Sequence, residues 1–388
     1  MREQTTITMY TKRKDTFIPI SRQKRLSPSD MLKIFEKRPW KYGEFKAQNW
    51  GNWLHHMSAY VGKLKPGFAH WLIRASTIPG DTVLDPFCGI GTVPLEADLM
   101  GRRAIGIDLN PYAAAISKAK FDRREMQEHI DYLQNLQLDV KSIKKNTISP
   151  FIRQYFHDKT LKEIFALRKI LIKEKQHFLL GCLIGILHGH RPGHLSATTS
   201  LVIPFVPDTV AEYREVIPRV VEKVRRMYRD GIPLKTNGKI YEKDSRNKIL
   251  RNDTVDAVIS SPPYYNTLNY VTDNRLRIAF LGYDKDGREA LDDRLIQHRQ
   301  DYLKDMIKVG QHLRNCIKPD GYCIFVLGDL HLGKKVVNTA EDIGQVYKDI
   351  GFKVHNKIIE DRMPDNKSHP SAYKRRKNDR ILFMVNKK

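Results

Sequence analysis

The stretch Ser261-Pro262-Pro263-Tyr264 places a hydroxyl, two rigid prolines and an aromatic ring directly after a short apolar run. A proline fixes φ and has no N–H, so it can hold a carbonyl oxygen outward as an acceptor without a competing donor. The Ser261 side chain and the Pro262 carbonyl would then accept two hydrogen bonds from one ligand, and Tyr264 would stack on a flat group. The alternative is a rigid turn with a core tyrosine. Asp256, at the start of the run, is expected to cap the strand rather than act on a substrate.

A second chemical signal lies at residues 83–92, which read VLDPFCGIGT between an expected strand and an expected helix. Gly89 and Gly91 would let the backbone pass close to a ligand, and the turn would aim the N–H groups of the helix at it. The dinucleotide-binding pattern GxGxxG is absent, because threonine, valine and proline follow Gly91. Gly-x-Gly alone also occurs in turns where glycine serves only packing, and residues 85–87 make the signal more specific.

Asp108 ends the next expected strand, about twenty residues after the glycine turn. A carboxylate at this distance typically accepts hydrogen bonds from the two hydroxyls of an adenosine ribose. The alternative is a capping or solvated aspartate. Its register with the glycine turn favours the ribose role.

Alternating helices and strands are expected to position these residues. They are a helix over 67–77, a strand over 82–87, a helix over 92–101, a strand over 102–110 and a helix over 111–126. Asn110 can cap the last helix, with Pro111 in the favoured first position. Later strands are expected over 238–244, 256–261 and 321–329, followed by an antiparallel pair over 351–360 and 378–385. This order predicts an α/β fold with a Rossmann-like, doubly wound and mostly parallel sheet.

The alternation stops between residues 121 and 237, which look mostly helical, with helices expected over 157–178 and 209–230. The apolar stretch 178–187 is about half a membrane span and is interpreted as a buried helix. The predicted domains are an N-terminal extension over 1–45, a core formed by 46–120 and 238–388, and a helical insertion over 121–237.

The charge balance indicates a polyanionic partner. Of 388 residues, 68 are Lys or Arg and 44 are Asp or Glu, which gives a formal net charge of +24. Phosphate contacts supply most non-specific nucleic-acid affinity, so this excess favours nucleic acid over a small neutral substrate. An anionic membrane surface is the competing partner, and a basic protein without a polyanionic partner is the remaining alternative. The four cysteines form no CxxC or Cys/His pattern, and the N-terminus has no apolar signal core, so we expect a soluble, cytoplasmic protein without metal or disulfides.

Residues 85–92 match the turn DPFxGxGT in full, and the Ser-Pro-Pro-Tyr tetrapeptide follows at the matching strand end. The sequence thereby resembles the S-adenosylmethionine-dependent DNA amino-methyltransferases over roughly 50–130 and 238–388. The resemblance implies S-adenosylmethionine as cofactor, with its methionine end in the glycine turn and its ribose on Asp108. Asp244 matches the position that contacts the adenine amino group.

The segment 55–73 resembles the one that closes the cofactor pocket in this family, which implies roles for Tyr60, Lys65 and Pro66. The cofactor residues implied by the resemblance are Tyr60, Lys65, Asp85, Pro86, Phe87, Cys88, Gly89, Gly91, Thr92, Asp108 and Asp244. The implied catalytic residues are Ser261, Pro262, Pro263 and Tyr264. The exocyclic amine of a base is a poor nucleophile, because its lone pair is delocalised into the ring. Two acceptors at its N–H groups would free the lone pair, once the base has left the duplex.

The type of the first tetrapeptide residue favours one target atom. In the family, serine before the prolines is associated with N4 of cytosine, and asparagine or aspartate with N6 of adenine. Enzymes that methylate cytosine C5 use a cysteine that follows a proline, and no cysteine here does. We expect a site-specific cytosine-N4 DNA methyltransferase. The alternatives are an adenine-N6 DNA enzyme, an RNA methyltransferase of the tRNA guanine-N2 type, and a nucleic-acid-binding protein without activity; the turn disfavours a dehydrogenase.

Three basic segments are candidates for reading the target. The polar stretch 188–200 is either a loop that contacts base edges and phosphates or a capped loop between buried helices, and 266–282 is expected to form a helix beside the site. The run 371–380 is either a phosphate-contacting loop or a solvated charge cluster. The candidate nucleic-acid contacts are Arg191, His194, Asn266, Arg275, Lys374, Arg375 and Arg376. The expected partners are duplex DNA with a flipped base and a cognate restriction endonuclease, in a prokaryotic cytoplasm, with no membrane.

Overall fold

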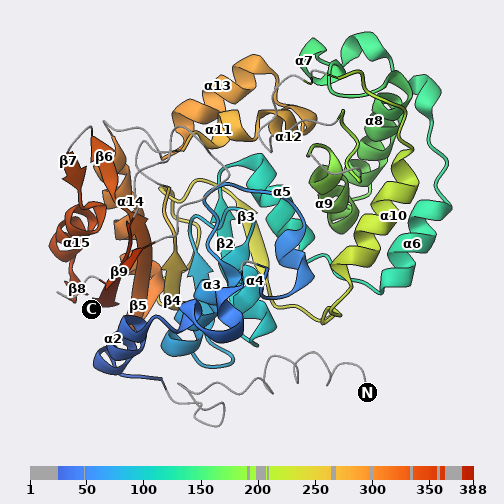
Figure 1. Ribbon diagram of the computed structural model, residues 1–388. Helices are drawn as coiled ribbons and strands as arrows, with labels where there is room; N and C mark the ends of the chain where they lie inside the picture. The colour runs from blue at the N-terminus through green and yellow to red at the C-terminus, as the bar shows by residue number, and fades with distance from the viewer. Residues whose placement is uncertain are drawn as a thin grey trace.

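The computed structural model describes residues 25–47, 49–189, 193–197, 207, 209–263, 268–296, 301–332, 335–355, 359–362 and 378–388. Figure 1 shows a twisted central sheet with helices on both faces and a group of helices, α6 to α10, to one side. The sheet has eight strands in the order β3-β2-β1-β4-β5-β10-β8, and β9 pairs with β10. Its strands are β1 Thr82–Asp85, β2 Arg103–Asp108, β3 Lys239–Glu242, β4 Val255–Ser260, β5 Ile317–Gly328, β8 Phe352–Val354, β9 Ile359–Arg362 and β10 Asn378–Asn386. A separate hairpin pairs β6 Leu330–Leu332 with β7 Lys335–Val337.

The direction of the strands confirms the predicted Rossmann-like, doubly wound sheet. Strands β3, β2, β1, β4 and β5 are parallel, and β10 is antiparallel to β5, β8 and β9. The chain adds β2 and β3 on one side of β1, and then β4 and β5 on the other side. The strand order therefore reverses between β1 and β4, and open α/β sheets bind ligands at the carboxyl ends beside such a point. The single strand expected over 351–360 is instead two strands, β8 and β9, both paired with β10.

The two faces of the sheet are covered by different helices. Alternate residues of a strand point to opposite faces. In β5, Ile324 and Val326 join an apolar cluster with helices α2 and α3, whereas Phe325 and Leu327 join a second cluster with α14 and α15. The helices around the sheet are α2 Pro28–Lys37, α3 Pro66–Ser76, α4 Thr92–Leu99, α5 Pro111–Ala119, α14 Tyr302–Cys316 and α15 Thr339–Ile350. Trp40 stacks on Phe68 of α3, with ring centroids 4.4 Å apart, so residues N-terminal to position 46 are part of the first cluster.

The helices between residues 121 and 237 build a third apolar cluster beside α5. They are α6 Met126–Gln134, η4 Val140–Ser142, η5 Lys145–Thr147, α7 Pro150–Arg153, α8 Asp158–Lys173, α9 His177–Ile186 and α10 Val216–Met227. The predicted buried helix over 178–187 is confirmed as α9. A Cβ at Gly185 of α9 would stand well under 3.0 Å from Met57 O, so this helix touches the backbone that precedes α3. Lys223 of α10 donates to His56 O at 2.9 Å. The division into core and insertion stays a prediction.

Several predicted helices have different bounds in the structure; the helix expected over 157–178 ends at Lys173 as α8, and α9 begins separately at His177. The helix expected over 111–126 ends at Ala119, and the ammonium group of the next residue, Lys120, donates to the Ile90 carbonyl. The helix expected over 209–230 begins only at Val216, close to Pro218, a residue that the first turn of a helix tolerates. The helix expected over 266–282 is divided into α11 Tyr270–Asp273 and α12 Arg275–Phe280, which meet at Asn274.

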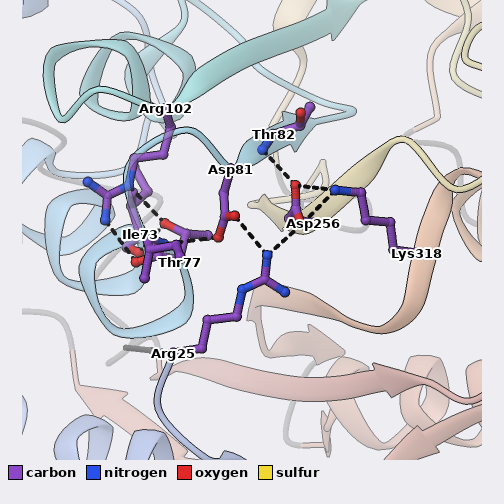
Figure 2. A network of polar contacts seen from close by, with 9 residues as sticks. Arg25, Ile73, Thr77, Asp81, Thr82, Arg102, Asp256 and Lys318 are labelled. Carbon is purple, nitrogen blue, oxygen red and sulfur yellow. Dashed lines mark hydrogen bonds and ion pairs between the residues drawn. The ribbon is translucent and has the colours of Figure 1, made fainter. Parts of the chain in front are cut away.

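A polar network ties the N-terminal segment to the edge of the sheet opposite the strands' carboxyl ends, as Figure 2 shows. Asp256 of β4 accepts from Thr82 N at 2.9 Å, from Lys318 Nζ at 2.9 Å and from Arg25 Nη2 at 2.5 Å. Arg25 also bonds Asp81 Oδ1 at 2.7 Å. Burial alone would raise the pKa of Asp256, but the hydrogen bonds from its three donors hold this pKa below the ordinary aspartate value. Asp256 therefore has a structural role, close to the capping role predicted for it.

Three further observations concern the described part of the chain. None of its helices is long and apolar enough to cross a membrane. Its four cysteines are reduced and buried. No group of three or more His, Cys, Asp or Glu side chains is arranged there to hold a metal ion.

Candidate active site at the carboxyl ends of β1 and β4

The carboxyl ends of β1 and β4 bring the glycine turn and the tetrapeptide together. β1 ends at Asp85 and β4 ends at Ser260, and the Ser260 hydroxyl donates to Asp85 Oδ1 at 2.6 Å. A cavity that is open to solvent lies at these strand ends. It is lined by Tyr60, Gly62, Lys63, Leu64, Asp85, Pro86, Phe87, Cys88, Gly89, Thr92, Val93, Asp108, Leu109, Asn110, Asp244, Ser245, Ser261, Pro263, Tyr270, Leu295 and Ile296. Residues that are far apart in sequence thus share one site at the switch point of the sheet.

The structure gathers most of the residues predicted for this site. All of the predicted cofactor residues except Lys65 and Gly91 line the cavity. Of the tetrapeptide, Ser261 and Pro263 line it and Pro262 does not, while Tyr264 lies outside the described residues. Their binding and catalytic roles stay predictions.

The glycine turn packs against helix α5, which stabilises its conformation. Gly89 and Gly91 have φ values of +51° and +76°, a region that favours glycine. Ser117 of α5 donates to Gly89 O at 3.2 Å, and a Cβ at Gly91 would stand well under 3.0 Å from the Ser117 hydroxyl. Gly91 is therefore needed for packing against α5, whereas Gly89 is the glycine that faces the cavity.

Asp108 lies at the end of β2 beside the glycine turn. Its Oδ2 accepts from Gly89 N at 2.8 Å and its Oδ1 accepts from Asn110 N at 2.8 Å. Each carboxylate oxygen has a further lone pair, so both can still accept from a ligand hydroxyl. Burial raises the pKa of Asp108 to about 6, although the two backbone N–H groups oppose this shift. The carboxylate is thus ionised at neutral pH and suited to two adjacent hydroxyls.

Ser261 is the described residue of the tetrapeptide with an unsatisfied polar group. Its hydroxyl oxygen is buried and has no hydrogen-bond partner among the described residues. The residue follows β4 directly and lines the cavity next to Pro263. Buried polar groups nearly always have a partner, so this hydroxyl indicates a place for a ligand that can hydrogen-bond.

Asp244 follows β3 and lines the cavity, but a neighbouring arginine shares its carboxylate. Arg246 donates to Asp244 Oδ2 through Nη2 at 2.7 Å and to Oδ1 through its backbone N at 3.0 Å. Burial opposes ionisation here, yet the contacts with Arg246 hold the pKa of Asp244 below its ordinary value. Ser245 donates to Pro86 O at 2.5 Å, which ties the end of β3 to the glycine turn.

The segment before α3 forms one wall of the cavity. The lysine that lines this wall is Lys63, whereas the sequence predicted Lys65. Lys65 is the N-cap residue of α3 and does not line the cavity, whereas Tyr60, Lys63 and Leu64 do. Lys63 Nζ donates to His55 O at 2.9 Å, and burial lowers its pKa to about 8. Sequence reasoning located the right segment but could not tell which lysine turns inward.

The predicted nucleic-acid contacts are only partly described. Arg191, Asn266, Lys374, Arg375 and Arg376 lie outside the described residues. The loop that contains His194 is anchored by Arg214, which donates to the carbonyls of His194 at 2.7 Å and of Ser196 at 2.6 Å. Arg275 is half-buried and donates to Thr272 O at 3.0 Å. These contacts leave the proposed roles of His194 and Arg275 as predictions.

Arg277, one turn beyond the site, is buried rather than exposed to a nucleic acid. It donates to His188 O at 3.2 Å, and its guanidinium lies over the Tyr112 ring, 5.5 Å from the centroid. Tyr112 in turn donates to the carbonyl of Ala59, next to the cavity residue Tyr60. Arg277 therefore connects α12, the loop after α9 and the cavity wall.

Comparison with known proteins identifies relatives of the chain. The DNA methylase family N6_N4_Mtase matches residues 2–119, which include the glycine turn and Asp108. The type II methyltransferase M.BsoBI of Geobacillus stearothermophilus is 24% identical over 305 residues, covering 65% of this chain and 56% of that enzyme. The type II methyltransferase M.XycI of Xanthomonas campestris pv. cyanopsidis is 59% identical over 53 residues, covering 14% of this chain and 18% of that enzyme.

A third relative is the tRNA (guanine(10)-N2)-dimethyltransferase of Methanothermobacter thermautotrophicus, 42% identical over 52 residues, which cover 13% of this chain and 16% of that enzyme. The chain spans at most 56% of the length of these three relatives. The family match contains the glycine turn, and the similarity to M.BsoBI extends well beyond it. The chain is thus similar to the DNA methylase family over residues 2–119 and to type II methyltransferases over a longer stretch.

Proposed function

We propose that the chain is a site-specific DNA methyltransferase that transfers a methyl group from S-adenosylmethionine to the exocyclic N4 of cytosine. The observation that carries the proposal is the Ser261 hydroxyl, which is buried at the cavity without a partner among the described residues. Leaving such a group unsatisfied costs roughly 1–3 kcal/mol. A ligand that presents an N–H group to Ser261 would recover that cost.

The cavity fits the cofactor of the family. Asp108 is suited to the ribose hydroxyls, because both of its oxygens keep a free lone pair after accepting their backbone N–H groups. Asp244 is suited to the adenine amino group, and Gly89 lets the turn approach the methionine end. Lys63 is suited to the methionine carboxylate, since its ammonium group is mostly charged at neutral pH. When bound, S-adenosylmethionine would supply a methyl group on a sulfonium; as the amine takes that methyl group, it would pass a proton to solvent, and the sulfur would keep the electrons of the C–S bond.

The tetrapeptide would prepare the amine for this transfer. The Ser261 hydroxyl and the Pro262 carbonyl would each accept one N–H of the amino group, which draws the nitrogen lone pair out of conjugation with the ring. Asp85 would act by positioning, since it accepts from Ser260 Oγ and Phe87 N and so joins the tetrapeptide strand to the glycine turn. Closing the site to bulk water would strengthen these hydrogen bonds.

Serine at position 261 supports cytosine N4 over adenine N6, for which asparagine or aspartate is usual in the family. The second candidate is an RNA methyltransferase, favoured by the short similarity to the tRNA enzyme. The longer similarity to a type II DNA methyltransferase and the residue type of Ser261 favour DNA.

Duplex DNA with the target base turned out of the helix is the proposed substrate, and the net charge of +24 supports a polyanion. We assign target recognition to the helical insertion over 121–237, in which the carbonyls of His188 and His194 after α9 accept from Arg277 and Arg214. A cognate restriction endonuclease is the proposed cellular partner, because the relatives M.BsoBI and M.XycI are type II methyltransferases.

Methyl transfer from labelled cofactor to duplex DNA, single-stranded DNA and RNA, followed by nucleoside mass spectrometry, tests the proposal. We expect label in N4-methylcytosine of duplex DNA. Label only in N6-methyladenine would refute the choice of base, and label only in RNA would refute the choice of nucleic acid. Ser261→Ala should lower the rate at least about 100-fold. The matched control is Ser29→Ala, at an exposed serine of α2, which should retain the wild-type rate.

A further inference from the structure

Tyr270 is a cavity residue on α11, the first helix after the tetrapeptide. Its ring stacks on Tyr60, with centroids 5.8 Å apart and an interplanar angle of 22°. Tyr60 in turn lies against the glycine turn, because a Cβ at Gly89 would stand 3.3 Å from Tyr60 Cε1. The two tyrosines thus form one aromatic wall that extends from the glycine turn to the segment after β4.

A glycine makes this wall possible. Gly62 has a φ of +82°, and a Cβ there would stand 2.8 Å from Leu268 Cδ1 and 3.3 Å from the Tyr270 hydroxyl oxygen. A larger residue would push the segment before α3 away from α11. The close approach of these two segments, and with it the position of Tyr270, is therefore built into the backbone.

The order of the strands indicates which part of the cavity Tyr270 serves. Asp108 and Asp244, the groups suited to a nucleoside, follow β2 and β3 on one side of β1. Ser261 follows β4 on the other side of β1, and Tyr270 belongs to the same segment. Tyr270 thus belongs to the segment that carries the amine acceptors, and it meets Tyr60 in the same cavity.

We propose that Tyr270 stacks on the target base, in addition to the Tyr264 ring predicted from the tetrapeptide. The inference rests on the proposed function and assigns to its base pocket a residue that lies outside the tetrapeptide. Tyr270 lines the cavity as well as packing on Tyr60, and flat aromatic groups favour stacked or edge-to-face contact with such a ring. Stacking of a base on an aromatic side chain is tolerant of base type. Tyr270 therefore contributes affinity for an extruded base of any type, whereas Ser261 selects the base by the amino group on its hydrogen-bonding edge.

Two duplexes that differ only at the target position test this role. One carries the target base, and the other carries an abasic site there; both are titrated in the presence of S-adenosylhomocysteine. We expect Tyr270→Leu to weaken binding of the base-containing duplex about 5- to 150-fold more than binding of the abasic duplex. Tyr270→Phe keeps the ring and should show no such difference. Tyr42→Leu, at a tyrosine that is 63% exposed, is the matched control and should change neither affinity.

The outcomes separate this inference from the proposed function. Equal weakening of both duplexes by Tyr270→Leu would mean a purely structural role and would overturn the assignment. Weaker binding of S-adenosylhomocysteine by Tyr270→Leu in the absence of DNA would also overturn the assignment, because it would mean that the ring contacts the cofactor. If the wild-type chain methylates no DNA at all, it is the proposed function that fails. Methylation by the wild type together with unchanged binding by Tyr270→Leu would refute the role of Tyr270 alone.

Discussion

Replacing Gly91 by alanine should destabilise the protein more than the same change at a glycine with a similar backbone conformation. Gly91 has a φ of +76°, and a Cβ there would collide with the Ser117 hydroxyl and stand 3.2 Å from Ser117 Cβ. A left-handed backbone costs a residue with a side chain about 1–2 kcal/mol, and overpacking typically costs about 1–3 kcal/mol. Gly91→Ala is thus expected to lower the free energy of unfolding by about 2–5 kcal/mol.

Gly80 provides the matched control for this prediction. Its φ is +87°, and a Cβ at Gly80 would meet no described atom within 4 Å. Gly80→Ala should therefore cost only the backbone component, about 1–2 kcal/mol. The difference between the two variants isolates the collision with Ser117.

Urea unfolding of both variants, each in the wild-type and the Ser117→Ala background, measures that difference. Ser117→Ala removes the colliding hydroxyl together with its hydrogen bond to Gly89 O, at a cost of about 1 kcal/mol. Gly91→Ala should cost less in this background, whereas Gly80→Ala should cost the same in both. The affinity for S-adenosylhomocysteine should fall in Gly91→Ala alone, because the displaced turn carries Gly89 away from Asp108. Equal losses for the two glycines, or a loss at Gly91 that ignores the Ser117 background, would refute the reasoning.

Three further predictions concern carboxylates. Burial raises the pKa of Asp108 to about 6, so cofactor affinity should fall as the pH drops through 6, and titrations of Asp108→Asn should lose this dependence. Burial also raises the pKa of Asp85 to about 7, so between the two pKa values the folded state holds a proton that the unfolded chain has released. The stability that this proton contributes is therefore present at low pH and is lost as the pH rises through 7. Urea unfolding of Asp85→Asn should lack this pH dependence. Asp256 has a lowered pKa, so the stability it contributes is present above the ordinary aspartate pKa and is lost as the pH falls through the folded value. In the same assay Asp256→Ala should lower the free energy of unfolding by about 3 kcal/mol, because Thr82 N and Lys318 lose their acceptor. Arg25→Met should lower it by only about 1 kcal/mol, because the Arg25 side chain is 38% exposed.

The sequence predicted the parts of the site that depend on strand order and spacing. Gly89, Asp108 and Ser261 each follow a strand at its carboxyl end, and parallel strands bring such ends to one edge of the sheet. Their meeting at one cavity therefore needed only the identification of the strands. The same argument predicted the antiparallel strand β10, although it merged β8 and β9 into one segment.

The sequence could not predict the roles of residues that depend on tertiary packing. Lys63 and Lys65 are two residues apart and chemically alike, and only the path of the backbone before α3 decides that Lys63 lines the cavity. Gly91 matched the family turn, but its requirement comes from Ser117 of a different helix. The segment 266–282 was expected beside the site, but Tyr270 within it was not singled out, because its place depends on a contact with Gly62, far away in the chain.

The close contact between α9 and the backbone before α3 limits which segments of this protein can be exchanged for those of another. Gly185 leaves no room for a Cβ beside Met57 O, Gly181 leaves none beside Ala119, and Lys223 caps the carbonyl of His56. The helical region is therefore in close contact with the segment before α3 and with α5, and at Gly185 and Met57 the two backbones meet directly. If the helical region reads the target, as proposed, a chimera that replaces it must keep the segment 53–57 together with the incoming helices.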